Sequence, residues 1–285
     1  VAADWVMPVA SEVVTVGVIA GVVAVAVLAG CLGSMLGIGG GVIMVPALTI
    51  GFGLPIKTAI ATSMVCVIAT SAVAQLSFMR SGMTNVRLGF ALEMASAAGA
   101  LLGGIAAVVL NARILQVCFA ALLVYVAIHV NRRRAENEVQ RTGVLEGAFY
   151  DRAERRSVAY GVKRLRSGFA MSVGAGGVAA MLGVGGGLLK VPIMNIVMGV
   201  PLKPTIATSN LMIGVTAATG ALVFYGRGFV DPIYAVPAAL GILAGAQAGA
   251  HLAARLPIAV LGGVFRVLLA CFAVVMVLQA AGVRL

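Results

Sequence analysis

Two nearly identical runs of glycine lie inside apolar sequence. "LGIGGGVIMVP" occupies residues 36–46 and "LGVGGGLLKVP" occupies residues 182–192. Because glycine tolerates positive φ angles and close approach of other groups, we expect the helix to break at each run. A short helix that starts after the break would present unpaired N–H groups and the positive end of its dipole to an anion. The alternative is that the glycines only allow helices to pack closely, as small residues do in membranes.

A second polar motif follows each glycine run at the same distance. "PIKTAIATS" spans residues 55–63 and "PLKPTIATS" spans residues 201–209. Hydroxyl and amide groups inside apolar helices can donate hydrogen bonds to a ligand, or they can bond the carbonyl four residues earlier. The two motifs together predict a substrate site made of Gly39, Gly40, Gly41, Pro46, Thr62 and Ser63 in the first half, and Gly185, Gly186, Gly187, Lys190, Pro192, Thr208, Ser209 and Asn210 in the second.

Charged residues within apolar segments are costly in lipid and therefore indicate function. Lys190 takes the place that Met44 has in the first run, so we expect its ammonium beside the anion site. Glu93 and Arg266 could pair with each other, or Glu93 could carry a coupling proton. Lys57 and Lys203, next to prolines, are expected at the membrane interface, where they could also attract anions.

The composition is that of a polytopic membrane protein. Of the 285 residues, 61% are hydrophobic and 10% are charged, and the mean hydropathy is +1.10. A soluble globular chain carries roughly 25% charged residues. Since a span needs about 20 mainly apolar residues, the sequence predicts eight apolar segments, at residues 12–35, 56–79, 88–110, 112–130, 168–199, 204–225, 232–254 and 258–280.

The two halves of the chain match at an offset of 146 residues, the distance from Leu36 to Leu182. The same offset pairs Gly99 with Gly245 and Gly103 with Gly249. Duplicated halves with glycine-interrupted segments are typical of transporters. We therefore expect an all-α integral membrane fold with two homologous four-segment repeats, residues 1–131 and 167–285, joined by a linker at residues 132–166. The charges leave open whether the repeats are parallel or inverted.

The linker is strongly basic. It holds ten Lys and Arg residues against five acidic ones. Because basic segments beside membrane spans stay on the cytoplasmic side and contact anionic lipid, we expect a cytoplasmic linker in a multi-pass protein of the inner (plasma) membrane. The loop with Arg80 and Arg87 is expected on the same side. This distribution argues against nucleic-acid binding.

The duplicated L-G-x-G-G-G-x-x-x-V-P and P-x-K-x-x-x-A-T-S motifs, with the length and the eight segments, resemble the TauE/SafE family of sulfite exporters. The resemblance covers residues 13–280 and implies transport of sulfite, sulfoacetate or related sulfur anions and organic acids. It points to the glycines, prolines, Thr62, Ser63, Thr208 and Ser209 named above.

The sequence thus predicts a secondary transporter that exports a small anion by alternating access. Its other predicted partners are membrane lipid and a coupling proton or ion. Two alternatives remain, an anion channel and a transporter of other small organic acids. The sequence shows no paired carboxylates, no Cys/His couple and no metal-ligand cluster. We therefore expect no enzyme, no metal and no cofactor, and the sequence leaves the oligomeric state undetermined.

Overall fold

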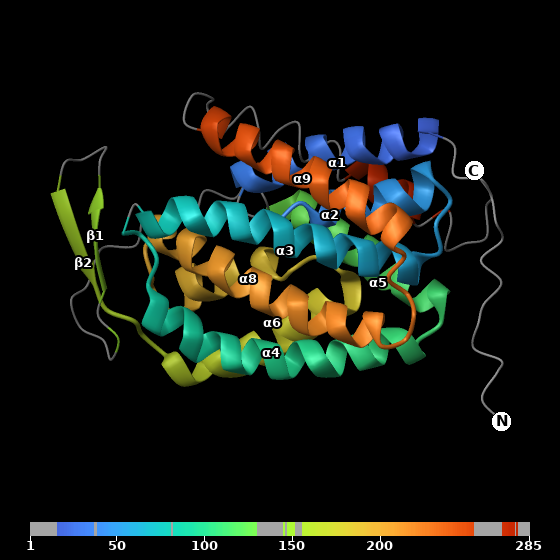
Figure 1. Ribbon diagram of the computed structural model, residues 1–285. Helices are drawn as coiled ribbons and strands as arrows, with labels where there is room; N and C mark the ends of the chain where they lie inside the picture. The colour runs from blue at the N-terminus through green and yellow to red at the C-terminus, as the bar shows by residue number, and fades with distance from the viewer. Residues whose placement is uncertain are drawn as a thin grey trace.

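The fold is a bundle of long helices with a small hairpin at one end (Figure 1), as a computed structural model describes it. The structure describes residues 16–36, 39–80, 82–129, 145, 147–151, 156–253, 270–276 and 278. The helices on the N-terminal side of the linker are α1 (Val16–Leu36), α2 (Gly41–Pro46), the π-helical turn η1 (Ala47–Gly51), α3 (Ile56–Arg80), α4 (Val86–Val109) and α5 (Ala112–His129). Those on the C-terminal side are α6 (Leu165–Leu182), α7 (Gly187–Pro192), the π-helical turn η2 (Ile193–Val197), α8 (Leu202–Tyr225) and α9 (Pro232–Ala253).

Six described helices are long and apolar enough to cross a membrane, namely α1, α3, α4, α6, α8 and α9. Large apolar side chains on their outer faces, such as Leu28, Leu222 and Leu240, are exposed, as expected for groups in contact with lipid. The predicted segment at residues 168–199 is interrupted, because α6 ends at Leu182 and α7 begins at Gly187. The eighth predicted segment, residues 258–280, lies outside the described residues apart from 270–276 and 278, so the count of eight stays a prediction.

Several elements on the two sides of the linker have bounds that agree when 146 is added to the residue number. The offset carries α2 onto α7 and η1 onto η2 without a shift, and it carries the start of α3 onto the start of α8. The contacts correspond as well. Gly99 and Gly103 of α4 lie against Val173 and Gly177 of α6, and the positions 146 residues away, Gly245 and Gly249 of α9, lie against Val27 and Cys31 of α1.

The close contacts also give the direction of each helix. In the pairs α4/α6 and α1/α9 the residue numbers rise together, so the two helices of each pair run in the same direction. In the pair α3/α8 they run oppositely, because Ser71 donates to the carbonyl of Asn210 at 2.5 Å while Met64 lies against Gly220. Matching helices on the two sides of the linker therefore cross the bundle in opposite directions.

Small residues allow these close helix pairs. The glycine stripe of α9, Gly241, Gly245 and Gly249, lies directly on the backbone of α1. Glycine at every fourth residue lets two helix backbones approach closely. This close packing matters in lipid, because there the hydrophobic effect does not drive helices together. The glycines of these helices thus serve close packing, as the alternative interpretation proposes. The two runs of three glycines differ, because they contain residues with positive φ angles.

The linker contains a β-hairpin, which the all-α prediction missed. Strands β1 (Gly147–Asp151) and β2 (Arg156–Tyr160) pair antiparallel, with Gly147 opposite Tyr160. Buried residues alternate with exposed ones, as a strand with one buried face requires, and Phe149 and Tyr160 belong to a buried cluster with Leu88 and Met198. The strongly charged surroundings hid this short alternation.

The hairpin is fastened to the loop between α3 and α4. Asn85, which caps α4 by accepting from the Leu88 N–H at 3.1 Å, donates from Nδ2 to the Tyr160 hydroxyl at 3.3 Å. Burial raises the pKa of the Tyr160 hydroxyl, and the hydrogen bond from Asn85 opposes that rise. The linker hairpin and this loop therefore lie at the same end of the bundle (Figure 1), in agreement with the expectation that they share one side of the membrane.

Candidate functional site

Both glycine runs break the helix, as the sequence predicts. Gly40 and Gly186 precede α2 and α7 with φ angles of 71° and 85°, in the left-handed region that favours glycine. The carbonyl of Gly40 accepts from the N–H groups of Ile43 and Met44, which starts the new helix. The corresponding carbonyl of Gly186 accepts from Leu189 and Lys190. Each break is thus a sharp turn followed directly by a helix.

The helix after each turn is too short to cross a membrane. Gly41–Gly51 and Gly187–Val197 are short apolar helices, each about 16 Å long at a rise of about 1.5 Å per residue. That is about half the thickness of a hydrocarbon core of roughly 30 Å. Pro46 and Pro192 end the α-helical part, and π-helical turns follow them, because proline has no N–H to donate and clashes with the preceding turn. The two prolines therefore lie in the middle of the half-helices, where the α-helical part changes to the π-helical turn.

The two turns come together where α3 and α8 cross. A Cβ added at Gly39 would lie 3.4 Å from Ile213 Cγ2 and 3.5 Å from Val67 Cγ1, and one added at Gly185 would lie 2.7 Å from Ile213 Cγ2. Val67 and Ile213 are fully buried and lie near the middle of their helices. The sequence analysis did not single out these two side chains, which are 146 residues apart and fill the space between the turns.

Ser63 links the two broken segments. Its hydroxyl donates to the carbonyl of Gly183 at 2.7 Å and lies 3.3 Å from that of Gly41. Thr208 accepts from the backbone N–H of Asn85 at 3.0 Å, and the Asn210 amide donates to the carbonyl of Ile206 at 2.9 Å. Asn210 therefore bonds the carbonyl four residues earlier in its own helix, which is the second of the two roles that the sequence left open.

Two of the predicted hydroxyls are buried without a hydrogen-bond partner in the part of the chain that the structure describes. These are Thr62 Oγ1 and Ser209 Oγ, and both side chains are fully buried. Most buried polar atoms are paired, and an unpaired hydroxyl calls for an explanation such as a ligand or an ion. Their 146-residue counterparts, Thr208 and Ser63, are both hydrogen-bonded.

Lys190 lies in a closed group of three polar side chains. Its Nζ is 2.8 Å from Glu93 Oε2 and also donates to Thr216 Oγ1, and the Thr216 hydroxyl donates to Glu93 Oε1 at 2.6 Å. The side chains of Lys190 and Glu93 are 1% and 6% exposed. A buried charge needs a partner, so the pairing explains how two charges persist here. Sequence reasoning selected Lys190 and Glu93 separately but did not pair them, and it missed Thr216, although Thr216 is two helical turns from Ser209 on the same helix.

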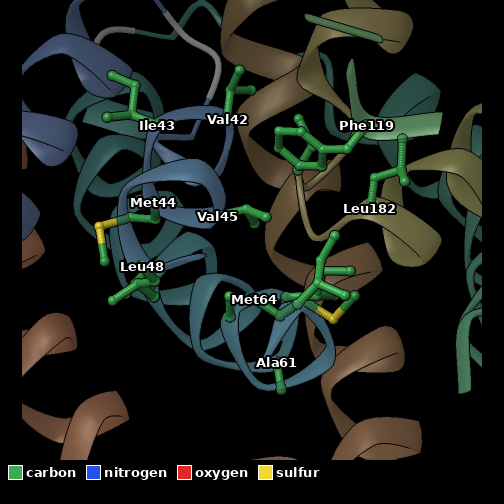
Figure 2. Close-up of a cluster of buried hydrophobic side chains, with 14 of the residues drawn as sticks. Val42, Ile43, Met44, Val45, Leu48, Ala61, Met64, Phe119 and Leu182 are labelled. Atoms are coloured by element: carbon green, nitrogen blue, oxygen red, sulfur yellow. The ribbon is translucent and has the colours of Figure 1, made fainter. Parts of the chain in front are cut away.

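The counterparts of the three polar residues in the other half are mostly apolar. Met44 takes the place of Lys190 and is fully buried among apolar side chains. Figure 2 shows Met44, Val45 and Leu48 grouped with Ala61 and Met64 of α3. Thr70, the counterpart of Thr216, donates to the carbonyl of Cys66 at 2.9 Å. The two glycine turns thus have different electrostatic surroundings.

The remaining charged candidates have separate environments. Lys57 donates to the carbonyl of Val108 at 2.5 Å and lies 5.6 Å from the ring centroid of Phe229, which fits the expected position at a helix end. Arg266 lies outside the described residues. The Glu93 carboxylate is paired with Lys190, and the predicted pairing of Glu93 with Arg266 stays a prediction.

Long apolar helices with two broken segments that meet at half depth define a multi-pass helical membrane protein. The family model for the sulfite exporter TauE/SafE matches residues 22–276, and the chain belongs to this family. A relative from Bacillus subtilis (strain 168), "Probable membrane transporter protein YunE", is 24% identical over 237 residues, which are 80% of this chain and 86% of the relative. No solved structure matches the chain. Family and relative together support a role in membrane transport, which the sequence also predicts.

Proposed function

We propose that the protein is a secondary transporter that exports small sulfur-containing anions, such as sulfite, sulfoacetate or related organosulfonates. The observation that carries the proposal is the meeting of the two glycine turns between Val67 and Ile213 at the middle of the bundle. Each turn starts a half-helix, so two positive dipole ends approach one region. The description of the matching family as a sulfite exporter supports sulfur oxyanions as the class of substrate.

The unpaired hydroxyls support a polar ligand in this region. Thr62 and Ser209 are buried with no partner among the described residues, and a hydroxyl can donate one hydrogen bond to an oxyanion. Ser63, Thr208 and Asn210 are hydrogen-bonded to the protein. In the proposed site, Thr62 and Ser209 therefore bind the substrate directly, and the other three hold the turns and helices in position.

Alternating access is the proposed mechanism, with residues 1–131 and 167–285 as two repeats. Matching helices run in opposite directions, as in transporters with inverted repeats, in which one repeat rocks against the other around a central site. Val67 and Ile213 are fully buried between the turns, and this filled centre favours a transporter over an open channel. Glu93 is the proposed group for coupling to a proton or ion.

Flux through purified protein in proteoliposomes tests the proposal. Labelled sulfite and sulfoacetate should show saturable uptake and counterflow, whereas a channel would give flux without either. A Gly186→Val variant should lose at least nine-tenths of this flux while still inserting, because valine is strained at a φ of 85°.

Gly17→Val is the matched control, since a Cβ at Gly17 meets nothing within 4 Å. It should keep the wild-type flux. Full flux in Gly186→Val, or no saturable flux of any small anion through the wild type, would refute the proposed site.

A further inference from the structure

The Glu93 carboxylate lies 2.8 Å from the Lys190 ammonium, beside the second glycine turn. We propose that Glu93 and the substrate bind Lys190 in alternation, and that Glu93 takes up one proton when it releases the lysine. A singly charged anion then crosses together with one proton, and in export the outward gradient of the anion drives both. This inference rests on the proposed function and specifies its coupling.

The ammonium of Lys190 lies beside the second glycine turn. The Lys190 N–H donates to the carbonyl of Gly186 at 2.9 Å, and Lys190 Cε is 3.3 Å from the point where a Gly186 Cβ would stand. The lysine side chain therefore runs back along α7 toward the start of the half-helix. Its charge is next to the turn at which the substrate is proposed to bind.

The hydrogen bonds around Lys190 form a ring that can open. Lys190 donates to Thr216 and to Glu93 Oε2, and Thr216 donates to Glu93 Oε1. An ammonium has three donors, so one stays for an incoming oxyanion. If Glu93 is protonated, its new O–H can donate to the Thr216 oxygen, and the carboxyl group keeps a partner when Lys190 turns to the substrate.

Charge balance requires the proton. The pair of Lys190 and Glu93 is neutral and almost fully buried. A substrate anion that joined the intact pair would leave one uncompensated negative charge in a site of low dielectric, which is strongly unfavourable. If the carboxylate gains a proton as the anion arrives, Lys190 stays an ammonium and the site is neutral before and after binding.

Among the described residues of the neighbouring long helices, the charged groups other than Glu93 lie in the first turns. Lys190 and Thr216 are its hydrogen-bond partners among the described residues. The charged residues of the neighbouring long helices, Arg87 of α4, Arg166 of α6 and Lys203 of α8, lie in the first turns of those helices, and Tyr225 ends α8. No second acid or base on these elements shares the proton with Glu93.

Neither counterpart position carries a titrating side chain. Met44 and Ala239 stand at the positions that correspond to Lys190 and Glu93, and Thr70 bonds to its own helix. The described helices therefore hold one proton-binding group of this kind, which sets the ratio at one proton per singly charged anion. The lysine in the second glycine run is then part of the coupling, because it binds Glu93 and the substrate in turn.

The test uses full-length protein in proteoliposomes with labelled methanesulfonate, whose sulfonate stays ionised across the working pH range and carries no proton itself. A dye inside the vesicles reports proton movement. With a gradient of one pH unit, acid outside, the wild type should accumulate the anion about tenfold, because one pH unit is worth a factor of ten for one proton per anion. Protons and anions should enter in equal numbers.

The outcomes separate the coupling from the transport. Saturable uptake without response to the pH gradient would overturn the coupling and leave the proposed transport intact. Absence of saturable uptake, for methanesulfonate as for sulfite and sulfoacetate, would overturn both.

Variants assign the proton to Glu93. Glu93→Gln should reduce accumulation from about tenfold to about onefold, and it should lower gradient-driven uptake far more than exchange of labelled for unlabelled anion. Lys190→Met should raise the half-saturating anion concentration at least tenfold. Ser96→Ala, one turn further along α4, removes the hydrogen bond from Ser96 to the Ser172 carbonyl and should keep the tenfold accumulation.

A structural role for Glu93 would lower exchange and accumulation together, and that result would overturn the inference. The double variant Glu93→Ala with Lys190→Met gives each position the residue of its counterpart, Ala239 and Met44, so it guards against misfolding of the single variants. It should equilibrate the anion without responding to the pH gradient. Accumulation in this variant would equally contradict the assignment.

Discussion

At the scale of single residues, the pair formed by Glu93 and Lys190 shows how burial turns two costly charges into one neutral unit. Each charge alone in the bundle would be strongly unfavourable, and at 2.8 Å each compensates the other. Thr216 completes the pair by bonding both side chains. Removing one partner is therefore expected to cost more than removing both.

A double-mutant cycle measures this coupling. Glu93→Ala and Lys190→Met, made singly, should each lower the free energy of unfolding in detergent by about 3–5 kcal/mol, because each leaves a buried charge without a partner. The double variant should be within about 1 kcal/mol of the wild type or above it. Additive losses in the double variant would show that the two charges do not stabilise each other.

At the scale of elements, the glycines serve two purposes that look alike in the sequence. Those at Gly40 and Gly186 have positive φ angles and start half-helices. Those at Gly99 and Gly103 stay helical and let α4 lie directly on the backbone of α6. Run length separates the two uses, since both runs of three glycines break the helix, whereas the pair Gly103–Gly104 stays helical and glycines four residues apart make a flat face for packing.

Gly103→Leu tests the packing use. A Cβ there would overlap the backbone of Gly177, so α4 and α6 would have to separate. We expect a loss of about 1–3 kcal/mol in the free energy of unfolding in detergent, as for other overpacked sites. The control is Gly174→Leu on α6, where an added Cβ meets nothing within 4 Å, and equal losses in the two variants would contradict this explanation.

At the scale of the whole molecule, the opposite directions of α3 and α8 place matching loops at opposite ends of the bundle. The loop before α4 lies at the end that carries the linker hairpin, through the bond between Asn85 and Tyr160. The loop before α9 follows α8, which runs the other way. The two loops should therefore face different sides of the membrane.

Cysteine labelling checks this arrangement. Arg87 and Ile233 are exposed, begin matching helices and lie 146 residues apart. In a background without the four native cysteines, a thiol reagent that cannot cross the membrane should label Ile233→Cys in intact cells. It should label Arg87→Cys after permeabilisation, since the basic residues predict a cytoplasmic position for that end. Labelling of both from the same side would exclude opposite orientations.

Much of the architecture could be predicted from local sequence, because apolar length and glycine spacing act within a few turns of one helix. Both helix breaks and the long apolar helices follow from such patterns, and so does the membership in the TauE/SafE family that the family model shows. The β-hairpin escaped prediction, because five-residue strands give a weak alternation in a charged segment. Its burial in one cluster with Leu88 and Met198 depends on residues far from it in the chain.

The sequence by itself determined that Lys190 and Glu93 were unusual, since charges in apolar segments stand out wherever they are. Only the tertiary structure decided that they pair, that Thr216 joins them, and that Val67 and Ile213 separate the glycine turns. It also decided the opposite directions of matching helices, which the charges had left open. The physical reason is that these contacts join different helices, with Glu93 and Lys190 97 positions apart, and helix packing brings them together without leaving a periodic signal in the sequence.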